Sequence, residues 1–484
     1  MTQLKNLTPQ PLWSYFEEIC QVPRPSKKEE KIIRFLLDFA QSKGLEAKKD
    51  EIGNILIKKP ASPGRENDQT VILQSHVDMV CEKNSETIHN FETDAIKPFV
   101  DDGWVRAEGT TLGSDDGIGI AAQMAILSAT DISHGPVECL FTVDEETGLS
   151  GAFALQPGFL SGNTLLNLDS EDEGELFIGC AGGIDTVGTL TYTPESLPLA
   201  SFAIKLEVKG LQGGHSGDDI NKNRGNANKI LNRFLMEADK KFDMRLAEFN
   251  GGNLRNAIAR EAYAVVTVPH SQKESLMVEW NVFASEMEFE YERSEPKLRL
   301  QHQSVTLPQH VIDPDTKARL LKLITACPHG VLEMSSRMTG MVETSTNLAS
   351  VKFTEDNKIV LTTSQRSEIE GRKYMAAEME EAVMKLAGAE VEHSDGYPGW
   401  TPNPDSVVAK IAVESYKHLF GNAPVVKSIH AGLECGLFLE KYPSLDMVSF
   451  GPTIRGAHSP DERINIDTVN KFWKLLVDVL GNIH

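Results

Sequence analysis

The sequence lacks several features that mark specialised protein classes. Its six cysteines show no CxxC or Cys-His spacing, which disfavours both a disulfide framework and a thiolate zinc site. No apolar run approaches the length of a bilayer helix, and the first residues have no apolar core of signal-peptide length. We therefore expect a cytoplasmic protein with free thiols and no membrane partner.

Positive charge is also scarce. The 484 residues include 48 Lys and Arg against 70 Asp and Glu, which gives a formal net charge of -22. Because nucleic acids are bound by clusters of Lys and Arg, we expect no nucleic-acid partner. A hydrophobic content of 40% indicates an ordinary globular protein, and the length favours two domains or one domain with a large insertion.

Apolar periodicity divides the chain into three parts. Helical patterns over residues 9–43, followed by alternating strands and helices over residues 51–168, predict an α/β domain with a doubly wound, mainly parallel sheet. We assign residues 1–186 and 400–484 to this catalytic domain. Residues 187–399 are predicted to form an inserted α+β lid domain, in which a weak echo of one plan suggests two similar halves.

Three predicted strands end in chemically useful residues. The strands cover residues 71–75, 137–143 and 164–168. The residues at their ends are His76-Val77-Asp78, Asp144-Glu145-Glu146 and Asp169. Because functional groups of open α/β sheets collect at the carboxyl ends of the strands, we expect these side chains to share one cleft. His458 would join them if the predicted strand at 445–450 returns to the same sheet.

These residue types favour a two-metal site. Imidazole and carboxylate groups bind zinc and related ions, and a paired site needs one carboxylate that bridges both ions. Asp115 is the candidate bridge, because it lies in a Gly-rich turn directly before the helical run 121–127. Taken alone, Asp115 and Asp116 would more often be helix caps. We keep helix capping as the expectation for Asp116.

The other candidates also have simpler explanations. A single histidine such as His76 is about as often a buried, satisfied side chain, but alternation along a strand places Asp78 on its side, where Asp78 could orient the imidazole. An acidic pair such as Glu145-Glu146 is more often a solvated turn. In an extended chain these two side chains point to opposite sides, so that one could ligate metal while the other faces the reacting water.

Taken in order along the chain, the motifs resemble those of metallopeptidase family M20, and in particular its Xaa-His dipeptidase branch. The similarity runs the length of the chain. The motifs are His76-Val77-Asp78, Gly113-Ser114-Asp115-Asp116, Asp144-Glu145-Glu146-Thr147-Gly148, Asn167-Leu168-Asp169, Gly213-Gly214-His215-Ser216-Gly217 and Gly456-Ala457-His458-Ser459-Pro460. The resemblance implies hydrolysis of unblocked dipeptides, including Xaa-His dipeptides such as carnosine.

The resemblance also implies two divalent metal ions per subunit, zinc in the first place, with cobalt or manganese as alternatives. The implied ligands are His76 and Asp169 for one ion, Glu146 and His458 for the other, and Asp115 as the bridge. Two residues would be catalytic: Asp78 would orient His76, and Glu145 would be the general base that takes a proton from water. Asp169 stands where some members have Glu, a difference associated with peptidases rather than deacylases.

Three residues of the predicted lid would bind the substrate. The resemblance implies that His215 stabilises the oxyanion, and we expect Asn256 and Arg366 to bind the substrate carboxylate. Without the resemblance, simple exposure of His215 and surface pairing of Arg366 would be the expectations. Related enzymes often form dimers through the lid, so we expect a homodimer; the alternative is that a lid with two halves completes the site within one chain.

Two other functions stay open. One is a related M20 activity, such as a tripeptidase or an N-acyl amino acid deacylase, and a requirement for a free substrate amino terminus would separate a dipeptidase from a deacylase. The other is an inactive metal-binding scaffold that keeps the fold. The scaffold is disfavoured because Glu145 and all five candidate ligands are present.

Overall fold

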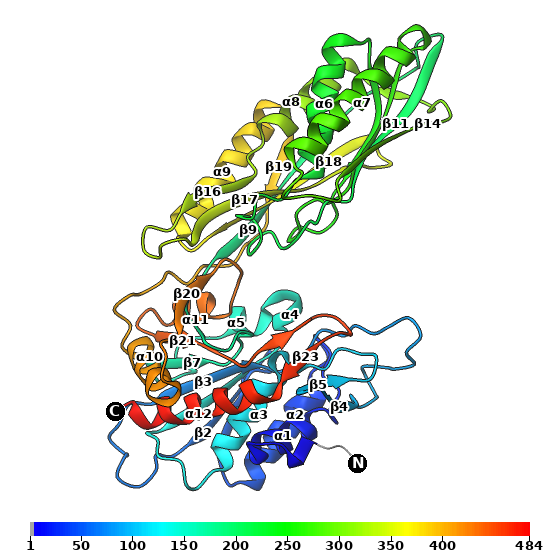
Figure 1. The fold of residues 1–484 in the computed structure, drawn as a ribbon. Coiled ribbons are helices and arrows are strands. Elements are labelled where there is room, and N and C mark those ends of the chain that lie inside the picture. Colours follow the sequence, from blue (N-terminus) through cyan, green and yellow to red (C-terminus); the bar gives the residue numbers. More distant parts are fainter. Residues whose placement is uncertain (1–3) are drawn as a thin grey trace. The chain divides into compact units, whose positions relative to one another are not determined.

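The computed structural model describes residues 4–484, which divide into two compact units (Figure 1). The first unit contains the chain up to Gly179, then Trp400–Ser428 and Leu433–His484; the second contains Cys180–Gly399 and Ile429–Gly432. The predicted first boundary, after residue 186, falls inside strand β9 (Gly182–Thr191) of the second unit. The second unit is therefore inserted in the sequence of the first.

The first unit is built on an eight-stranded sheet with the order β1-β2-β6-β3-β7-β21-β8-β20. Its four central strands, which are mutually parallel, are β6 (Val137–Thr142), β3 (Val71–His76), β7 (Thr164–Asn167) and β21 (Asp446–Ser449). Every residue of β3 and β6 is buried, so both faces of the sheet are covered. The predicted α/β class with a mainly parallel sheet is confirmed.

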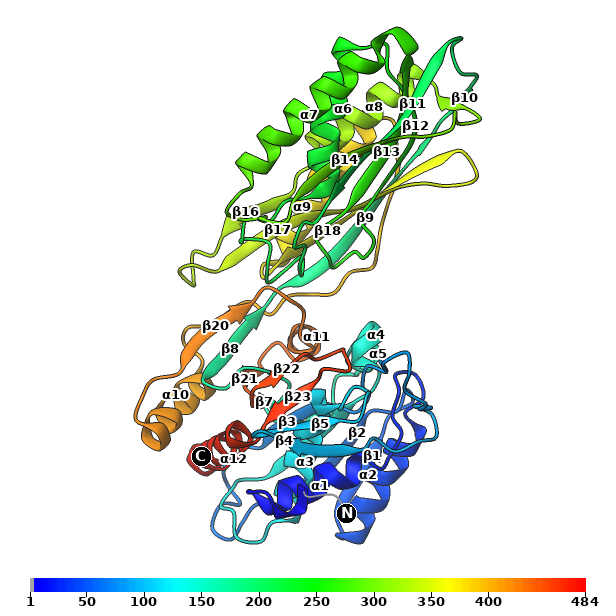
Figure 2. The ribbon, with the colours of Figure 1, turned by 45° about the vertical axis from the view of Figure 1, so that its right-hand side comes forward.

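The remaining elements of the first unit surround these strands (Figure 2). The outer strands are β1 (Glu46–Lys49), β2 (Ile55–Lys59), β8 (Glu175–Cys180) and β20 (Val425–Ile429). A smaller sheet with the order β22-β23-β5-β4 contains β4 (Pro98–Asp101), β5 (Trp104–Ala107), β22 (Ile454–Arg455) and β23 (Arg463–Asn465). The helices are η1 (Leu4–Asn6), α1 (Gln10–Ile19), α2 (Glu30–Ser42), α3 (Ser114–Ser128), α4 (Glu145–Gly148), α5 (Ser150–Ala154), α10 (Val407–Phe420), α11 (Cys435–Lys441) and α12 (Ile466–Asn482).

Sequence patterns explain several of these elements. Helix α1 buries the predicted face of Leu12, Phe16 and Ile19, so its apolar periodicity is that of a core-facing helix. Strand β21 lies between β7 and β8, which confirms that the tail returns to the first sheet. Asn465 caps the start of helix α12, because its side chain accepts a hydrogen bond from the backbone N–H of Thr468.

The second unit contains an antiparallel sheet covered by four helices. The strand order is β14-β11-β13-β12-β17-β18-β9-β19, and β16 also pairs with β17. Burial alternates along β13, so one face of the sheet is in the core and the other is partly exposed. Helices α6, α7, α8 and α9 lie along one face (Figures 1 and 2).

One order of elements occurs twice in this unit: a helix, two paired antiparallel strands, a second helix and a strand. The first set is α6 (Ala227–Lys241), β12 (Arg245–Gly251), β13 (Ala262–Pro269), α7 (Lys273–Glu290) and β14 (Arg299–Ser304). The second is α8 (Pro314–Ala326), β17 (Val342–Phe353), β18 (Lys358–Ser367), α9 (Glu370–Leu386) and β19 (Glu390–His393). Outside these sets lie β10 (Pro194–Glu195), β11 (Ser201–Lys209), η2 (His270–Gln272), β15 (Val311–Ile312) and β16 (Gly330–Met334).

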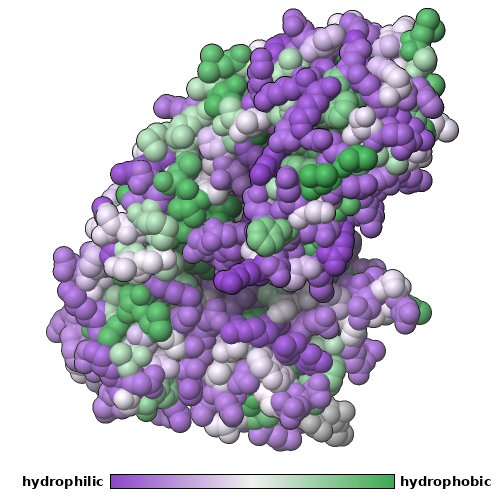
Figure 3. Space-filling model, turned by 45° about the horizontal axis from the view of Figure 1, so that its top comes forward, coloured by the Kyte–Doolittle hydropathy of each residue, from purple (hydrophilic) through white to green (hydrophobic). Residues whose placement is uncertain are grey.

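The surface agrees with the composition. Hydrophilic residues cover most of the face seen in Figure 3, and hydrophobic residues form only small groups there. Among residues 4–484, none of the helices is both long enough and apolar enough to cross a membrane.

Candidate functional site

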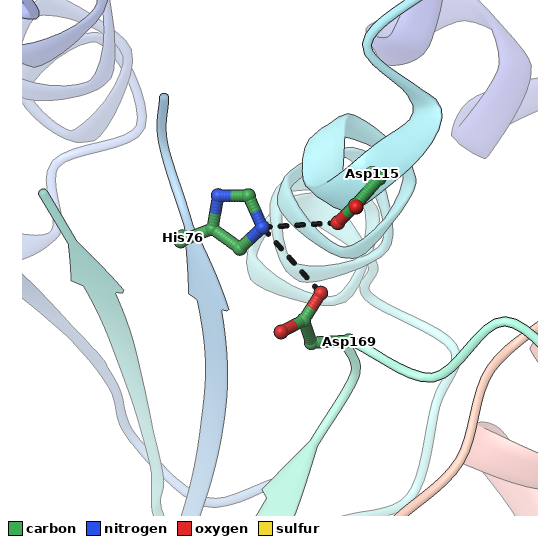
Figure 4. Close-up of side chains that lie close together, drawn as sticks. All are labelled: His76, Asp115 and Asp169. Carbon is green, nitrogen blue, oxygen red and sulfur yellow. Dashed lines mark hydrogen bonds and ion pairs between the residues drawn. The ribbon is translucent and has the colours of Figure 1, made fainter. Parts of the chain in front are cut away.

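The predicted strand-end residues of the first unit do lie together. His76 is the last residue of β3, and Asp169 lies two residues after β7, which is paired in parallel with β3. The imidazole Nε2 of His76 is 3.0 Å from Asp115 Oδ1 and 3.4 Å from Asp169 Oδ1 (Figure 4). All three side chains are largely buried. The three groups offer ligand atoms that lie within 4.8 Å of one another.

A second group shares Asp115. The Nε2 atom of His458 is 3.1 Å from Asp115 Oδ2 and 3.1 Å from Glu146 Oε2. The two oxygens of Asp115 therefore face two different histidines. His458 comes from the loop between β22 and β23, and 55% of its side chain is exposed, in contrast to the buried His76.

Asp78 contacts both the ring of His76 and the backbone of Glu145 and Glu146. Its Oδ1 atom is 3.3 Å from His76 Nδ1, on the opposite side of the ring from Asp115. The backbone N–H groups of Glu145 and Glu146 donate to the two oxygens of Asp78 at 3.0 and 3.2 Å. Asp78 thus holds both the His76 ring and the start of α4.

The extended conformation expected at Glu145 and Glu146 is wrong. Asp144 has a φ of 51°, a left-handed conformation, and the next four residues form the short helix α4. The two side chains are therefore not on opposite sides of a strand. Together with His76 they offer ligand atoms within 4.8 Å of one another, so both face the same cluster.

The Gly-rich turn places Asp115 at the irregular start of α3. Gly113 has a φ of 71°, and a Cβ atom there would meet the guanidinium of Arg24 at 2.6 Å, so glycine is required on both counts. Asp116 Oδ1 accepts a hydrogen bond from the N–H of Gly119 at 3.0 Å, which confirms the expected capping role. Asp115 instead points at His76 and His458.

The two histidines of the cluster have strongly raised pKa values. Burial lowers the pKa of His76, but Asp169, Asp115 and Asp78 outweigh this and hold it well above its ordinary value. Hydrogen bonds to Asp115 and Glu146 raise the pKa of His458 to about 11. Both histidines are therefore protonated at neutral pH when only protein surrounds them.

The carboxylates differ among themselves: hydrogen bonds to His458 and His76 outweigh burial and lower the pKa of Asp115, whereas two other carboxyl groups have raised pKa values. Burial, opposed by His76 and reinforced by Asp115, raises the pKa of Asp169 to about 7. Burial is also the largest cause of the raised pKa of Glu145, to which the charges of Asp169 and Glu146 add. More negative groups converge here than the two histidines balance. Such an excess attracts cations.

The three residues predicted on the substrate side lie near one another in the second unit. The guanidinium of Arg366, on β18, donates from Nε to Ser216 Oγ at 3.4 Å. The backbone N–H of Ser216 donates to the carbonyl of Asn256 at 2.8 Å, and Ser216 follows His215 directly. Arg366 is buried, whereas Asn256 is exposed.

His215 has a defined tautomer. Its Nδ1 atom accepts from the backbone N–H groups of Gly217 and Asp218, each at 3.3 Å. Burial and the charge of Arg366 lower its pKa, so the ring is neutral at neutral pH. The proton then belongs on Nε2, which makes this atom a hydrogen-bond donor.

Comparison with known proteins identifies the family. Residues 72–482 match Peptidase family M20/M25/M40. The chain belongs to this family.

Two close relatives support the assignment along the full length. The cytosol non-specific dipeptidase of Escherichia coli (strain K12) is 44% identical over 483 residues, which are 100% of this chain and 99% of the relative. The crystal structure of the aminoacylhistidine dipeptidase from Vibrio alginolyticus has a TM-score of 0.90 and 44% identity, covering 100% of this chain and 98% of the other.

A less similar protein shares the fold. A tripeptidase from Staphylococcus aureus has a TM-score of 0.57 and 18% identity, covering 99% of both chains.

M20 enzymes are metal-dependent peptidases, and the residues of the first unit fit that chemistry. Histidine nitrogen and carboxylate oxygen are the donors that zinc and similar ions accept. Within the described chain, Glu146 Oε1 is buried without a hydrogen-bond partner. A buried carboxylate oxygen without a partner is costly unless a cation or water satisfies it.

Glu434 is a buried carboxylate near the M20 site for which the sequence predicted no role. Glu434 Oε2 accepts from Gln74 Nε2 at 2.6 Å and from Thr142 Oγ1 at 2.7 Å, and these residues belong to β3 and β6. Burial is the main cause that raises the pKa of Glu434 to about 8. Its partner Gln74 is 360 residues away in the sequence, so no local pattern indicated their contact.

The sequence also predicted no role at the site for two residues near Arg366. Tyr397 accepts from Arg366 Nη1 through its hydroxyl at 2.9 Å, and the Nε2 atom of the buried His430 lies 2.8 Å from Ser345 Oγ. Burial, helped by the charge of Arg366, lowers the pKa of His430 to about 3, so the ring is neutral. Among the described residues, Arg366 forms no ion pair with a carboxylate of the chain.

Proposed function

We propose that this chain is a dinuclear metallo-dipeptidase of the cytoplasm that hydrolyses unblocked dipeptides, including Xaa-His dipeptides such as carnosine. The 44% identity to a cytosol non-specific dipeptidase and to an aminoacylhistidine dipeptidase supports the dipeptide substrate and the compartment. The observation that best supports the proposal is that two three-residue groups share Asp115 and lie beside Glu145. These groups are His76, Asp115 and Asp169, and Asp115, Glu146 and His458.

The proposed ligands follow from these groups. One ion would be held by His76 and Asp169, the other by Glu146 and His458, with Asp115 between them. Zinc suits this nitrogen and oxygen donor set best, with cobalt or manganese as alternatives. Bound there, the ions would lower the pKa of water and polarise the peptide carbonyl.

Glu145 would handle the proton. A carboxylate with a raised pKa can accept a proton from the attacking water and later donate it to the departing amine. Asp78 would keep both groups in place, because it contacts the His76 ring and accepts from the backbone N–H of Glu145. A neutral water and an intact peptide bond are thereby converted into a carboxylic acid and an amine.

The second unit would bind the substrate. Arg366 is a buried cation without a carboxylate partner in the described chain, so a substrate carboxylate would neutralise it. His215 has the tautomer required to donate from Nε2 to an oxyanion, and Asn256, whose carbonyl is bonded to Ser216, would add a contact.

We also propose a homodimer. Helix α7 exposes Val278, Val282 and Phe289, which are spaced to lie on one face, while its opposite face packs in the core. Size-exclusion chromatography with light scattering should give the mass of two chains. A Phe289→Glu variant should shift the protein toward one chain, and a monomeric wild type would contradict the proposal.

The test of function uses three substrates in parallel. Purified protein is assayed on L-carnosine, on an N-acetylated dipeptide and on a tripeptide, before chelation, after chelation and after zinc is restored. Metal-dependent cleavage of carnosine alone supports the dipeptidase. Cleavage of only the blocked substrate indicates a deacylase, and cleavage of only the tripeptide indicates a tripeptidase. No cleavage by protein that holds two metal ions would favour the scaffold.

A further inference from the structure

Glu462 makes an unusual set of contacts with the turn that carries Asp115. Its Oε2 atom accepts from the backbone N–H groups of Leu112 and Gly113 at 2.7 and 2.9 Å. Its Oε1 atom accepts from the N–H of Ser114 at 2.7 Å, from Ser114 Oγ at 2.6 Å and from the N–H of Asp115 at 3.4 Å. A single buried carboxylate therefore collects four successive backbone donors and one hydroxyl.

The position of Glu462 in the chain shows which two segments these hydrogen bonds connect. It lies four residues after His458, in the same loop between β22 and β23. The base of that loop is fixed by the pairing of Ile454 with Ile464. Besides the contact of the exposed His458 with Asp115, the buried Glu462 anchors the loop to the Asp115 turn.

Arg24 holds the same turn from the other side. Its Nη1 atom donates to the carbonyl oxygens of Val77 and Asp78 at 2.9 and 2.6 Å, and Nη2 donates to the carbonyl of Gly113. Gly113 thus donates its backbone N–H to the carboxylate of Glu462, and its carbonyl accepts from the guanidinium of Arg24. Charge-assisted hydrogen bonds of this kind are shorter and stronger than neutral ones.

We propose that Glu462 is a positioning residue for the second metal, because it fixes the separation of Asp115 and His458. Asp115 and His458 are separated by 343 positions in the chain, and Glu462 is bonded to the turn of one and belongs to the loop of the other. The inference rests on the ligands proposed above. It adds a residue that contacts neither the metal nor the substrate.

Replacement of Glu462 by Gln tests this directly. The amide has nearly the same size, but its NH₂ group would face backbone N–H donors that have lost their acceptor. We expect the turn and the His458 loop to separate, which lowers affinity for the ion held by Glu146 and His458. Loss of partners that orient metal ligands typically weakens binding by about 10- to 100-fold.

Glu138→Gln is the matched control. Glu138 is also buried and accepts from the N–H groups of Ser161 and Gly162 and from Ser161 Oγ, but it lies near the start of β6, at the opposite end from Glu145. Both variants should therefore lose thermal stability in the metal-free state. Only Glu462→Gln should weaken metal binding.

The measurement is the zinc content at equilibrium over a series of buffered free zinc concentrations, with the visible absorption of the cobalt-loaded protein as a second readout. Support requires that Glu462→Gln bind one ion nearly as wild type does and the other at least about tenfold more weakly, with an altered cobalt spectrum. Wild-type affinities and spectrum in this variant would overturn the proposal.

Two further outcomes are separable. If Glu462→Gln does not fold, Ser114→Ala removes one of the five hydrogen bonds, and a weakening of about threefold in the same binding series is expected for one lost bond. Unchanged affinity in Ser114→Ala would then overturn the role of Glu462. A wild type that binds no metal would instead refute the proposed metallopeptidase ligands.

Discussion

The two units contain histidines of opposite character. In the first unit, carboxylates raise the pKa of His76 far above its ordinary value and that of His458 to about 11. In the second, burial and Arg366 lower the pKa of His215 and take that of His430 to about 3. The same side chain is thus protonated at neutral pH in one unit and neutral in the other. The neighbours, rather than the residue type, decide which.

The largest effect should come from Glu145, the proposed proton carrier of the acidic cluster. Glu145→Gln keeps the size of the side chain but removes its basicity, so turnover should fall by about 100- to 10,000-fold. The measurement is kcat for carnosine, together with metal content. The ions should remain bound, since Glu145 is not one of the five proposed ligands. Full activity with both metals in place would refute its role.

Replacement of His215 should give the next largest effect, because its neutral ring is proposed to donate a hydrogen bond to the oxyanion of the transition state. His215→Ala should lower kcat by about 100- to 1,000-fold and change KM little. His270→Ala, which removes an exposed histidine of the same unit, is the control and should behave as wild type. A change in KM alone would mean that His215 only helps to bind the ground state.

Arg366 should affect binding more than turnover. Arg366→Ala should raise KM by about 10- to 100-fold, the usual cost of losing a hydrogen bond to a charged group. Arg255→Ala is the control, since Arg255 is exposed and pairs with Asp185 at 3.0 Å. A dipeptide whose carboxyl terminus is amidated should be bound poorly by wild type and no worse by Arg366→Ala. If Arg366→Ala raised KM for the amidated dipeptide as much as for the free dipeptide, recognition of the carboxylate by Arg366 would be contradicted.

The smallest effect concerns pH and sharpens the comparison between the units. Because the pKa of His458 is about 11, its ring is protonated throughout the neutral range and must release a proton before it can ligate a metal. Metal affinity should therefore rise with pH, by about tenfold per pH unit for each proton released. Titration calorimetry in buffers of different ionisation enthalpy measures that number. No proton release would show that His458 is not a ligand.

The sequence predicted much of the first unit because its signals are local. Apolar runs marked β3, β6 and β7, and the residues that follow them reach one cluster as parallel strands require. The conformation predicted for Glu145 and Glu146 was wrong, because the real one depends on Asp144, whose left-handed backbone no local pattern indicated. The roles of the ligands themselves remain predictions until metal is measured.

What the sequence could not predict depends on contacts between distant residues. Arg24 and Glu462 are ordinary charged residues in the chain, and their burial becomes visible only in the folded protein. Glu462, for example, is 348 residues from Ser114. A single sequence contains no signal of that pairing, since periodicity and turn chemistry reach only a few residues along the chain.

The place of β21 between β7 and β8 has a consequence for the order in which the chain is made. Residues 180–399 leave the ribosome before β21, so most of the second unit can begin to fold while the central sheet of the first still lacks a middle strand. His458 and Glu462 emerge later still. A nascent chain that ends before them has the Asp115 turn without the hydrogen bonds of Glu462 and, under the ligand set proposed above, would complete its metal site only after synthesis of the tail.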